Sequence, residues 1–204
     1  MLQLDEEIAE LVGIIFGDGN IWSNGRWYEV TITGNGETDQ LYFSYIADLV
    51  RRKLGSEPYV RVRGGLRLTI KSKEFYHFLT RELGIPSGEA KAMASIPPKI
   101  TKAQVLLKRF IRGIFDTDGS VFTSDKNGSP RYPCIEITNM NSKLITCVCE
   151  FLKASGYRAR LRCSRGVYKI ALNGRKMVSM WNMDIGASNP NKASKLAEIL
   201  NTVA

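Results

Sequence analysis

Histidine, paired cysteines and long apolar runs are scarce in this chain of 204 residues. With one histidine and four cysteines that never take Cys-x-x-Cys spacing, the chain lacks the usual ligand pattern of a structural zinc site. A disulfide framework is typical of much smaller secreted domains, so the thiols are expected to be reduced and mostly packed in the core: Cys134, Cys147, Cys149 and Cys163. His77, between Tyr76 and Phe78, is expected to pack rather than to activate a nucleophile. No apolar run approaches the roughly 20 residues of a membrane-spanning helix.

Basic residues outnumber acidic ones by 29 to 20, which gives a net charge of +9. This balance favours a polyanionic partner, most often nucleic acid. The first ten residues carry four acids and no base, unlike a secretory or transit peptide. The protein is therefore expected inside the cell, in the cytoplasm or nucleoid or in an organelle.

Two stretches that lie a hundred residues apart are nearly the same. Residues 11–19 read LVGIIFGDG and residues 111–119 read IRGIFDTDG, and each is an apolar helical run that ends in Asp-Gly. Such a repeat predicts two copies of one structural unit. Because Asp18 and Asp118 take the same place in each copy, the copies are expected to build one shared acidic site.

The pattern that follows each repeat is duplicated as well. A strand pair, an amphipathic helix, a second hairpin and a closing helix are expected in both halves. The predicted fold class is α+β, with two pseudo-symmetric αββαββα units, each an antiparallel sheet with helices on one face. Residues 1–96 are expected to form the first unit, residues 97–102 the linker and residues 103–204 the second unit.

Capping signals predict where these helices begin and end. The middle helix should begin near Thr38 in the first half and near Asn141 or Ser142 in the second. The closing helices should span Lys73–Leu83 and Arg175–Met183.

Small residues recur on one face of each repeated helix: Gly13 with Gly17, and Gly113 with Thr117. A glycine inside a helix costs about 1 kcal/mol relative to alanine, so the pairs need a reason. Close packing of two helices is one such reason. The glycines that directly follow the two aspartates fit a helix C-cap instead.

A carboxylate at the C-terminus of a helix is disfavoured, because the helix dipole places partial negative charge there. Two such carboxylates side by side also repel each other. Asp18 and Asp118 make sense in this arrangement if divalent cations bind between them. Mg²⁺ favours hard oxygen ligands, and paired metals can activate water and stabilise the leaving oxygen of a phosphodiester. A lone Asp-Gly more often marks a turn, but the duplication favours the site.

The two stretches resemble the LAGLIDADG motif of the homing endonucleases. The order of strands and helices resembles both halves of a single-chain, two-motif member, so the resemblance covers essentially the whole chain. It implies two or three divalent ions, Mg²⁺ with Mn²⁺ as a substitute, held by Asp18, Asp118, Gly17 and Thr117. Phe16 departs from the family's aspartate at that place, which Asp116 keeps, but this position is not the metal ligand.

In that family the two sheets form a saddle whose concave face lies in the DNA major groove. The sequence supports such a surface independently, because basic residues alternate with apolar ones such as Val60 and Val62, which should face the core. The alternative is an ordinary solvated sheet face, although such a face usually mixes both signs of charge. The expected DNA-binding residues are Asn20, Trp22, Asn24, Arg26, Glu29, Thr31, Thr33, Arg61, Arg63, Arg67, Thr69, Lys71, Glu136, Thr138, Asn139, Arg158, Arg160, Arg162 and Lys169.

Family members also place a basic residue near each metal cluster. The matching places hold Lys91 and Lys192, and the alternative for either is a surface lysine. A polar residue after the second strand is also usual in the family. Asn139 fits this pattern, whereas Gly34, Asn35 and Met140 depart from it.

The features together predict a monomeric, site-specific endonuclease that cuts both strands of a long asymmetric DNA target. By the resemblance, it leaves short 3′ overhangs and promotes intron homing. The expected catalytic residues are Asp18, Asp118, Lys91 and Lys192. The same scaffold serves intron RNA maturases and non-cleaving DNA-binding regulators, so the host intron RNA is an alternative partner. The presence of both acids favours cleavage, and no membrane partner is expected.

Overall fold

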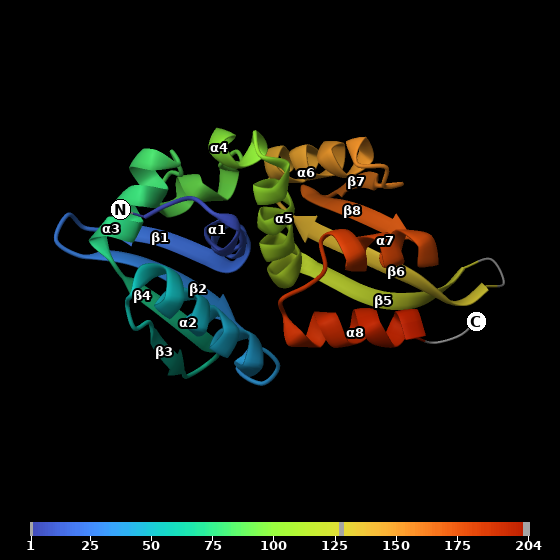
Figure 1. Cartoon of the computed structure of the whole chain (residues 1–204), viewed down its shortest axis with the longest axis horizontal. Coiled ribbons are helices and arrows are strands. Elements are labelled where there is room, and N and C mark those ends of the chain that lie inside the picture. The colour runs from blue at the N-terminus through green and yellow to red at the C-terminus, as the bar shows by residue number, and fades with distance from the viewer. Residues whose placement is uncertain (1, 127–128, 202–204) are drawn as a thin grey trace.

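The computed structural model describes residues 2–126 and 129–201, and it consists of two units of one plan (Figure 1). The first unit contains α1 (Glu6–Asp18), β1 (Gly19–Ser23), β2 (Tyr28–Gly34), α2 (Gln40–Leu54), β3 (Tyr59–Val62), β4 (Leu66–Lys71) and α3 (Lys73–His77). The second unit contains α5 (Gln104–Asp118), β5 (Gly119–Lys126), β6 (Ser129–Asn139), α6 (Ser142–Ala154), β7 (Arg160–Ser164), β8 (Val167–Asn173) and α7 (Arg175–Asp184). This order confirms the predicted α+β class with two pseudo-symmetric αββαββα units.

Each unit holds one four-stranded antiparallel sheet, and both sheets have the same topology. The strand order is β1-β2-β4-β3 in the first unit and β5-β6-β8-β7 in the second. Gly19 pairs with Ile32 and Gly119 pairs with Ile137, so both repeated helices enter their sheets at the same point. Alternate residues of the central strands are buried, which leaves the intervening residues on the opposite face of each sheet.

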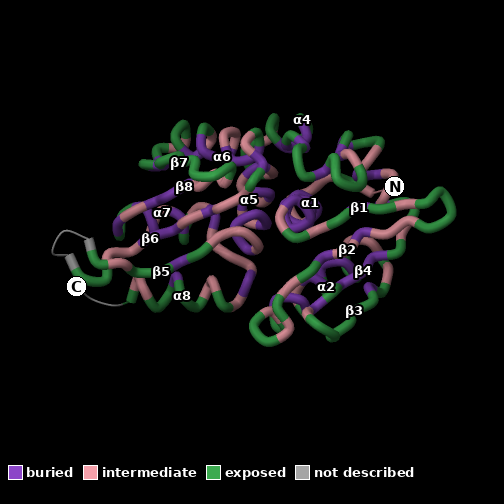
Figure 2. The backbone as a smooth tube through the Cα atoms, turned by 180° about the vertical axis from the view of Figure 1, so that it is seen from behind, coloured by how far each residue is buried: buried purple, intermediate pink, exposed green. Residues whose placement is uncertain are grey.

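The two units meet along α1 and α5, which lie side by side at the centre of the molecule (Figures 1 and 2). We call this contact between α1 and α5 the seam. Every residue of α1 from Ile8 to Phe16 is buried. Because both helices pack against their own sheet and against each other, a single apolar cluster runs through the two units.

Two helix boundaries in the first unit differ from the prediction. Helix α2 begins at Gln40 rather than near Thr38. The preceding turn is closed by the Asn35 N–H, which donates to Asp39 Oδ2 at 2.8 Å. Helix α3 ends at His77 and continues as a wider π turn, so the closing helix is not uniform up to Leu83. In the second unit Asn141 caps α6 as predicted, by accepting the Leu144 N–H at 3.1 Å.

Three short or terminal elements were not predicted. They are a 3-10 helix (Gly88–Met93), α4 (Pro98–Thr101) and α8 (Pro190–Asn201). The sequence does contain signals for α8. A proline stands at its first position, and its apolar residues recur at helical spacing, with Leu196 buried.

The division of the chain into residues 1–96, 97–102 and 103–204 stays a prediction. Most of the expected linker is occupied by α4, so this connection is partly helical. Met1 and residues 202–204 of the two proposed units lie outside the described residues.

The edge strand β3 is more exposed than its sequence indicated. Val60 and Val62 were expected in the core, but 40% and 65% of their surface is exposed. Helix α2 packs against α1 and against β4, the neighbouring strand, and makes few contacts with β3 at most. The predicted burial of both valines is therefore wrong, because the helical layer ends before the sheet does.

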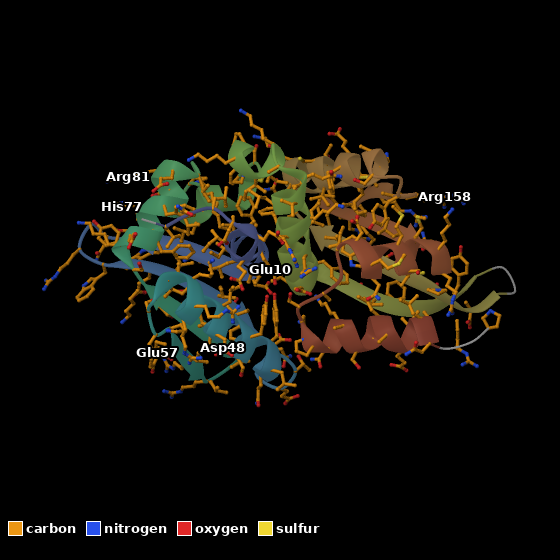
Figure 3. All side chains as sticks on the ribbon, in the orientation of Figure 1. Glu10, Asp48, Glu57, His77, Arg81 and Arg158 are labelled. Carbon is orange, nitrogen blue, oxygen red and sulfur yellow. The ribbon has the colours of Figure 1, made fainter. Side chains whose placement is uncertain are left out.

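None of the described helices is long and apolar enough to cross a membrane. All four cysteines are free thiols, and Cys134 and Cys149 are buried whereas Cys163 is exposed. His77 contacts the rings of Tyr28 and Tyr76, at centroid distances of 5.2 and 5.6 Å, on the periphery of the first unit (Figure 3). It packs as predicted.

Candidate active site

Glycine at two equivalent positions lets the backbones of α1 and α5 touch. A Cβ atom on Gly13 would overlap the carbonyl oxygen of Phe110, and one on Gly113 would overlap the carbonyl oxygen of Glu10. The two contacts are equivalent, because Gly113 corresponds to Gly13 and Phe110 corresponds to Glu10, each a hundred residues further along the chain. No larger residue fits at either position without moving a helix.

Asp18 and Asp118 end the two seam helices and come together there. A Cβ atom on Gly17 would lie 3.3 Å from Asp118 Oδ2 and would overlap the side chain of Thr117. The last turns of α1 and α5 are therefore in contact, and the structure brings the two predicted metal-binding carboxylates to one place.

The glycines that follow the two aspartates occupy the C-cap position, as expected, but for a different reason. Gly19 and Gly119 have φ values of −97° and −91°, so neither adopts the left-handed conformation that favours glycine in a helix cap. A Cβ atom at either position would instead collide with the preceding helical turn, at Ile15 or Phe115. Lack of space accounts for both glycines.

The electrostatics at the end of the seam disfavour the charged carboxylates. Burial and the charge of Asp118 raise the pKa of Asp18 to about 6. Burial also raises the pKa of Asp118, although a hydrogen bond from Asn139 opposes this. A cation that bound both groups would relieve the desolvation and the repulsion together.

A lysine covers the C-terminus of each seam helix. Lys91 Nζ donates to the main-chain oxygen of Ile15 at 2.6 Å, and Lys192 Nζ donates to the equivalent oxygen of Phe115 at 2.7 Å. Burial lowers the pKa of Lys91 to about 8 and lowers the pKa of Lys192 as well. The predicted basic residues thus lie beside the acidic site, and neither is a surface lysine.

One side chain beside the carboxylates differs between the units. Asn139 Nδ2 donates to Asp118 Oδ2 at 2.6 Å. The sheet registers place Gly34 at the equivalent position of the first unit. Within the described residues, no side chain donates to the carboxylate of Asp18, and Met140, which follows Asn139, is exposed.

A buried acid near the site was not assigned a role from the sequence. Asp116 is 2% exposed, and its Oδ2 accepts the Ser188 N–H at 2.8 Å. Its Oδ1 has no hydrogen-bond partner in the part of the chain that the structure describes. Burial raises the pKa of Asp116 to about 7. The available signal was the mismatch between Phe16 and Asp116 in otherwise matching stretches.

The open face of each sheet carries most of the residues expected to bind DNA. In one row Arg61 lies opposite Arg67, and in the equivalent row of the second sheet Arg162 lies opposite Lys169. The registers place these further residues on the same faces: Asn20, Trp22, Glu29, Thr31, Thr33, Thr69, Lys71, Glu136, Thr138 and Arg160.

The arginines of the first sheet differ from the basic residues on the outer helices. Within the described residues, Arg61 and Arg67 form no ion pair, although they face each other. On α2, by contrast, Arg51 bonds Glu57 at 2.6 Å. Like charges directly opposite each other destabilise a sheet, so such a row suits a polyanion that bridges them.

Four of the expected DNA-binding residues lie outside the sheet faces. Asn24 and Arg26 belong to the turn between β1 and β2, where Asn24 Oδ1 accepts the Trp27 N–H at 2.8 Å. Arg63 lies in the turn after β3, and Arg158 precedes β7 (Figure 3). Both strands are shorter than their alternation suggested, so Arg63 and Arg158 lie just beyond the strand ends, and their part in the basic face stays a prediction.

The donor atoms at the seam fit a cation that also binds phosphate. The described residues contain no group of three or more His, Cys, Asp or Glu that could hold a metal alone. Asp18 and Asp118 supply two carboxylates, and Mg²⁺ commonly takes one or two carboxylates together with water and phosphate oxygens. The main-chain oxygen of Thr117 accepts from Lys192 at 3.1 Å, so its part as a ligand, like that of Gly17, stays a prediction.

Comparison with solved structures shows a shared fold. A structure of the homing endonuclease I-DmoI in complex with DNA and Ca has a TM-score of 0.67 and 20% identity, over 95% of this chain and 97% of that one. Another, in complex with DNA and Mn, has a TM-score of 0.64 and 23% identity, over 90% and 97%. The N-terminal LAGLIDADG domain of DUF199/WhiA has a TM-score of 0.60 and 17% identity, over 95% and 86%.

Two much longer proteins contain stretches similar to this chain. The tRNA-splicing ligase RtcB of Pyrococcus abyssi is 29% identical over 159 residues, and the DNA polymerase of Thermococcus hydrothermalis is 26% identical over 151 residues. The matches cover 71% and 72% of this chain but only 17% and 8% of those proteins. In addition, residues 106–180 match the family described as LAGLIDADG-like domain. This match lies within the second unit, and the chain as a whole shares the two-unit fold of the homing endonuclease I-DmoI.

Proposed function

We propose that this protein is a site-specific DNA endonuclease that hydrolyses both strands of a long asymmetric target with divalent ions. One juxtaposition supports the proposal: Asp18 and Asp118 meet at the end of the seam, between two sheets whose open faces carry arginines. A polyanion bound across both sheets would pass over the two carboxylates.

The residues at the seam have distinct parts in this proposal. Asp18 and Asp118 would hold Mg²⁺ or Mn²⁺ against the scissile phosphates. When bound, such an ion lowers the pKa of a coordinated water and stabilises the leaving oxygen. Lys91 and Lys192 lower the pKa of both carboxylates by their charge and so favour the ionised form that binds metal. Asn139 fixes the orientation of Asp118.

The two sheets would read different half-sites, because their open faces differ in sequence. Arginine and lysine pair with guanine edges and with phosphates, while threonine and asparagine read other base edges. The family resemblance further suggests cutting across a narrow minor groove, short 3′ overhangs, and spread of an intron that carries the gene.

The test uses the whole protein with Mg²⁺ and a plasmid that carries the joined exons flanking its own gene. Linearisation is expected with the native protein, and it should be lost with EDTA and with Asp18→Asn or Asp118→Asn. Asp48→Asn on α2 is the matched control, since it lies on the outer surface of the first unit (Figure 3) and should leave cutting unchanged. Cutting that survives either substitution at the seam contradicts the proposal. Stimulation of intron splicing without any cut would favour the maturase on this scaffold.

A further inference from the structure

The seam has two crossings that are related by the pseudo-symmetry of the chain. At one crossing the residues near Phe16 meet those near Phe110, and at the other the residues near Asp116 meet those near Glu10. The backbone contacts at Gly13 and Gly113 show that these crossings are geometrically equivalent. Equivalent places therefore hold chemically different residues.

At the first crossing the two facing side chains are apolar. Phe16 and Phe110 pack edge to face, with ring centroids 5.1 Å apart and an angle of 74° between the rings. Phe16 is 5% exposed and Phe110 is fully buried. Edge-to-face aromatic pairs contribute beyond the apolar area that they bury.

The second crossing is polar and equally buried. Glu10, which Figure 3 shows in the middle of the molecule, is 3% exposed. Its Oε1 accepts the Tyr45 hydroxyl at 2.6 Å, and its Oε2 lies 3.7 Å from Arg112 Nη1. Asp116 reaches the same crossing from α5 and accepts the Ser188 N–H.

The N-terminal part of the seam repeats this difference. Arg109 of α5 bonds Glu6 of α1 at 2.7 Å. The equivalent residues of the other unit are Ala9 and Leu106, which carry no charge. In the charged pairs across the seam, α1 thus supplies the acids Glu6 and Glu10, and α5 supplies the arginines Arg109 and Arg112.

We infer that the seam is a recognition surface with two unlike faces, so that each unit accepts the other unit and rejects a second copy of itself. Pairing of two first units would place Glu10 against Phe16, and pairing of two second units would place Asp116 against Phe110. In the first arrangement Glu10 keeps the Tyr45 hydroxyl but loses Arg112, and in the second Asp116 keeps the Ser188 N–H but faces a phenyl ring. Each arrangement buries a carboxylate against a phenyl ring, and uncompensated buried charge is strongly destabilising. This inference stands whether or not the protein cuts DNA.

Two full-chain variants with the same amino-acid composition as the native chain test which units pair with each other. Phe16→Asp with Asp116→Phe places polar residues at both key positions of the first unit and apolar ones at both positions of the second. Like units then match each other, so we expect a concentration-dependent dimer by light scattering, whereas the native chain measured in parallel should be a monomer. Adding Glu10→Phe and Phe110→Glu exchanges the two crossings and should return a monomer whose Tm regains at least half of the loss.

A double variant that stays monomeric with the native Tm would overturn the inference, and so would a quadruple variant that dimerises like the double one. If the double variant does not fold, a double-mutant cycle at the half-exposed ion pair of Glu6 and Arg109 tests the inference instead. Glu6→Arg and Arg109→Glu should each lower the Tm by about 2 °C or more, and the two together should restore it, since opposite charges again face each other. Additive losses in that cycle would contradict the inference.

Discussion

The side-chain amide of Asn139 donates to Asp118 Oδ2 at 2.6 Å, whereas the first unit has Gly34 at the equivalent position. The two carboxylates of the site are therefore held differently. Asp118 is fixed by a neutral donor that favours its ionised form, and Asp18 is not. Any larger residue at Gly34 would collide with Phe43, so the first unit has no room for a matching donor.

Replacement of Asn139 should make the two acids more alike. Asn139→Ala removes the hydrogen bond that opposes the raised pKa of Asp118, so this pKa should rise further. The pH at which Mg²⁺-dependent cutting is half-maximal should move upward, by about one unit or less for a hydrogen bond of ordinary strength. Met140→Ala, at the exposed neighbouring residue, is the control. A pH profile identical to that of the native protein would show that Asn139 does not act on Asp118.

Asp18 should make the metal-free protein less stable as the pH rises from about 4 to about 6. Its pKa in the folded state, about 6, lies above the ordinary value of 3.8, so the folded state binds its proton more tightly than the unfolded state. Asp18→Asn should therefore raise the Tm at pH 8 and have little effect below pH 4. Neighbouring atoms desolvate the Asp18 carboxylate, but the residue keeps exposed surface, and solvent screening should limit the gain to about 1 kcal/mol, or about 2 to 4 °C for a chain of this size.

Thermal unfolding with EDTA at several pH values measures this effect. Asp48→Asn is the control, since this exposed acid bonds Arg51 at 2.6 Å and gains nothing from neutralisation. A Tm at pH 8 that falls on substitution of Asp18 would contradict the assigned electrostatics.

The close contact of the seam helices predicts an unusual sensitivity to a single methyl group. Gly13→Ala would place a Cβ atom on the carbonyl oxygen of Phe110, where only backbone could move aside. Overpacking typically costs about 1–3 kcal/mol, and here we expect the upper end or more. Gly36→Ala, whose Cβ would lie 3.7 Å from its nearest neighbour, should be neutral. Equal denaturation midpoints for both variants would rule out the tight packing.

The open face of the first sheet should dominate the salt dependence of DNA binding. Arg61→Gln with Arg67→Gln should weaken binding and reduce the slope of log K against log salt by about two, one per lost phosphate contact. Arg51→Gln on α2 removes the same charge where Glu57 already neutralises it, so the slope should hold. Titrations at several salt concentrations measure both. An unchanged slope in the double variant would place the DNA elsewhere.

Much of the architecture could be predicted because the same sequence pattern occurs in both halves of the chain. The matching positions of Gly13 and Gly113, and of Asp18 and Asp118, predict the helix contact and the shared acidic site. The alternation of Val30 and Ile32 with polar residues likewise predicted which face of β2 is buried.

The features that could not be predicted depend on tertiary contacts, which the sequence of a single strand or helix does not reveal. Whether Val60 is buried depends on how far α2 reaches over the sheet, which is a property of the packing. The role of Asp116 depends on Glu10 from the other unit, more than a hundred residues away. Lys91 could be matched by position, but its bond to the end of α1 follows from the path of the chain after α3.

The single apolar cluster that passes through both units has a consequence for how such a protein changes over time. The core residues of one unit cannot change independently of the other, because a substitution that loosens packing in either unit lowers the Tm of the whole protein. New DNA specificity is therefore most accessible through the solvent-facing rows of the sheets, which can vary while the shared interior stays as it is.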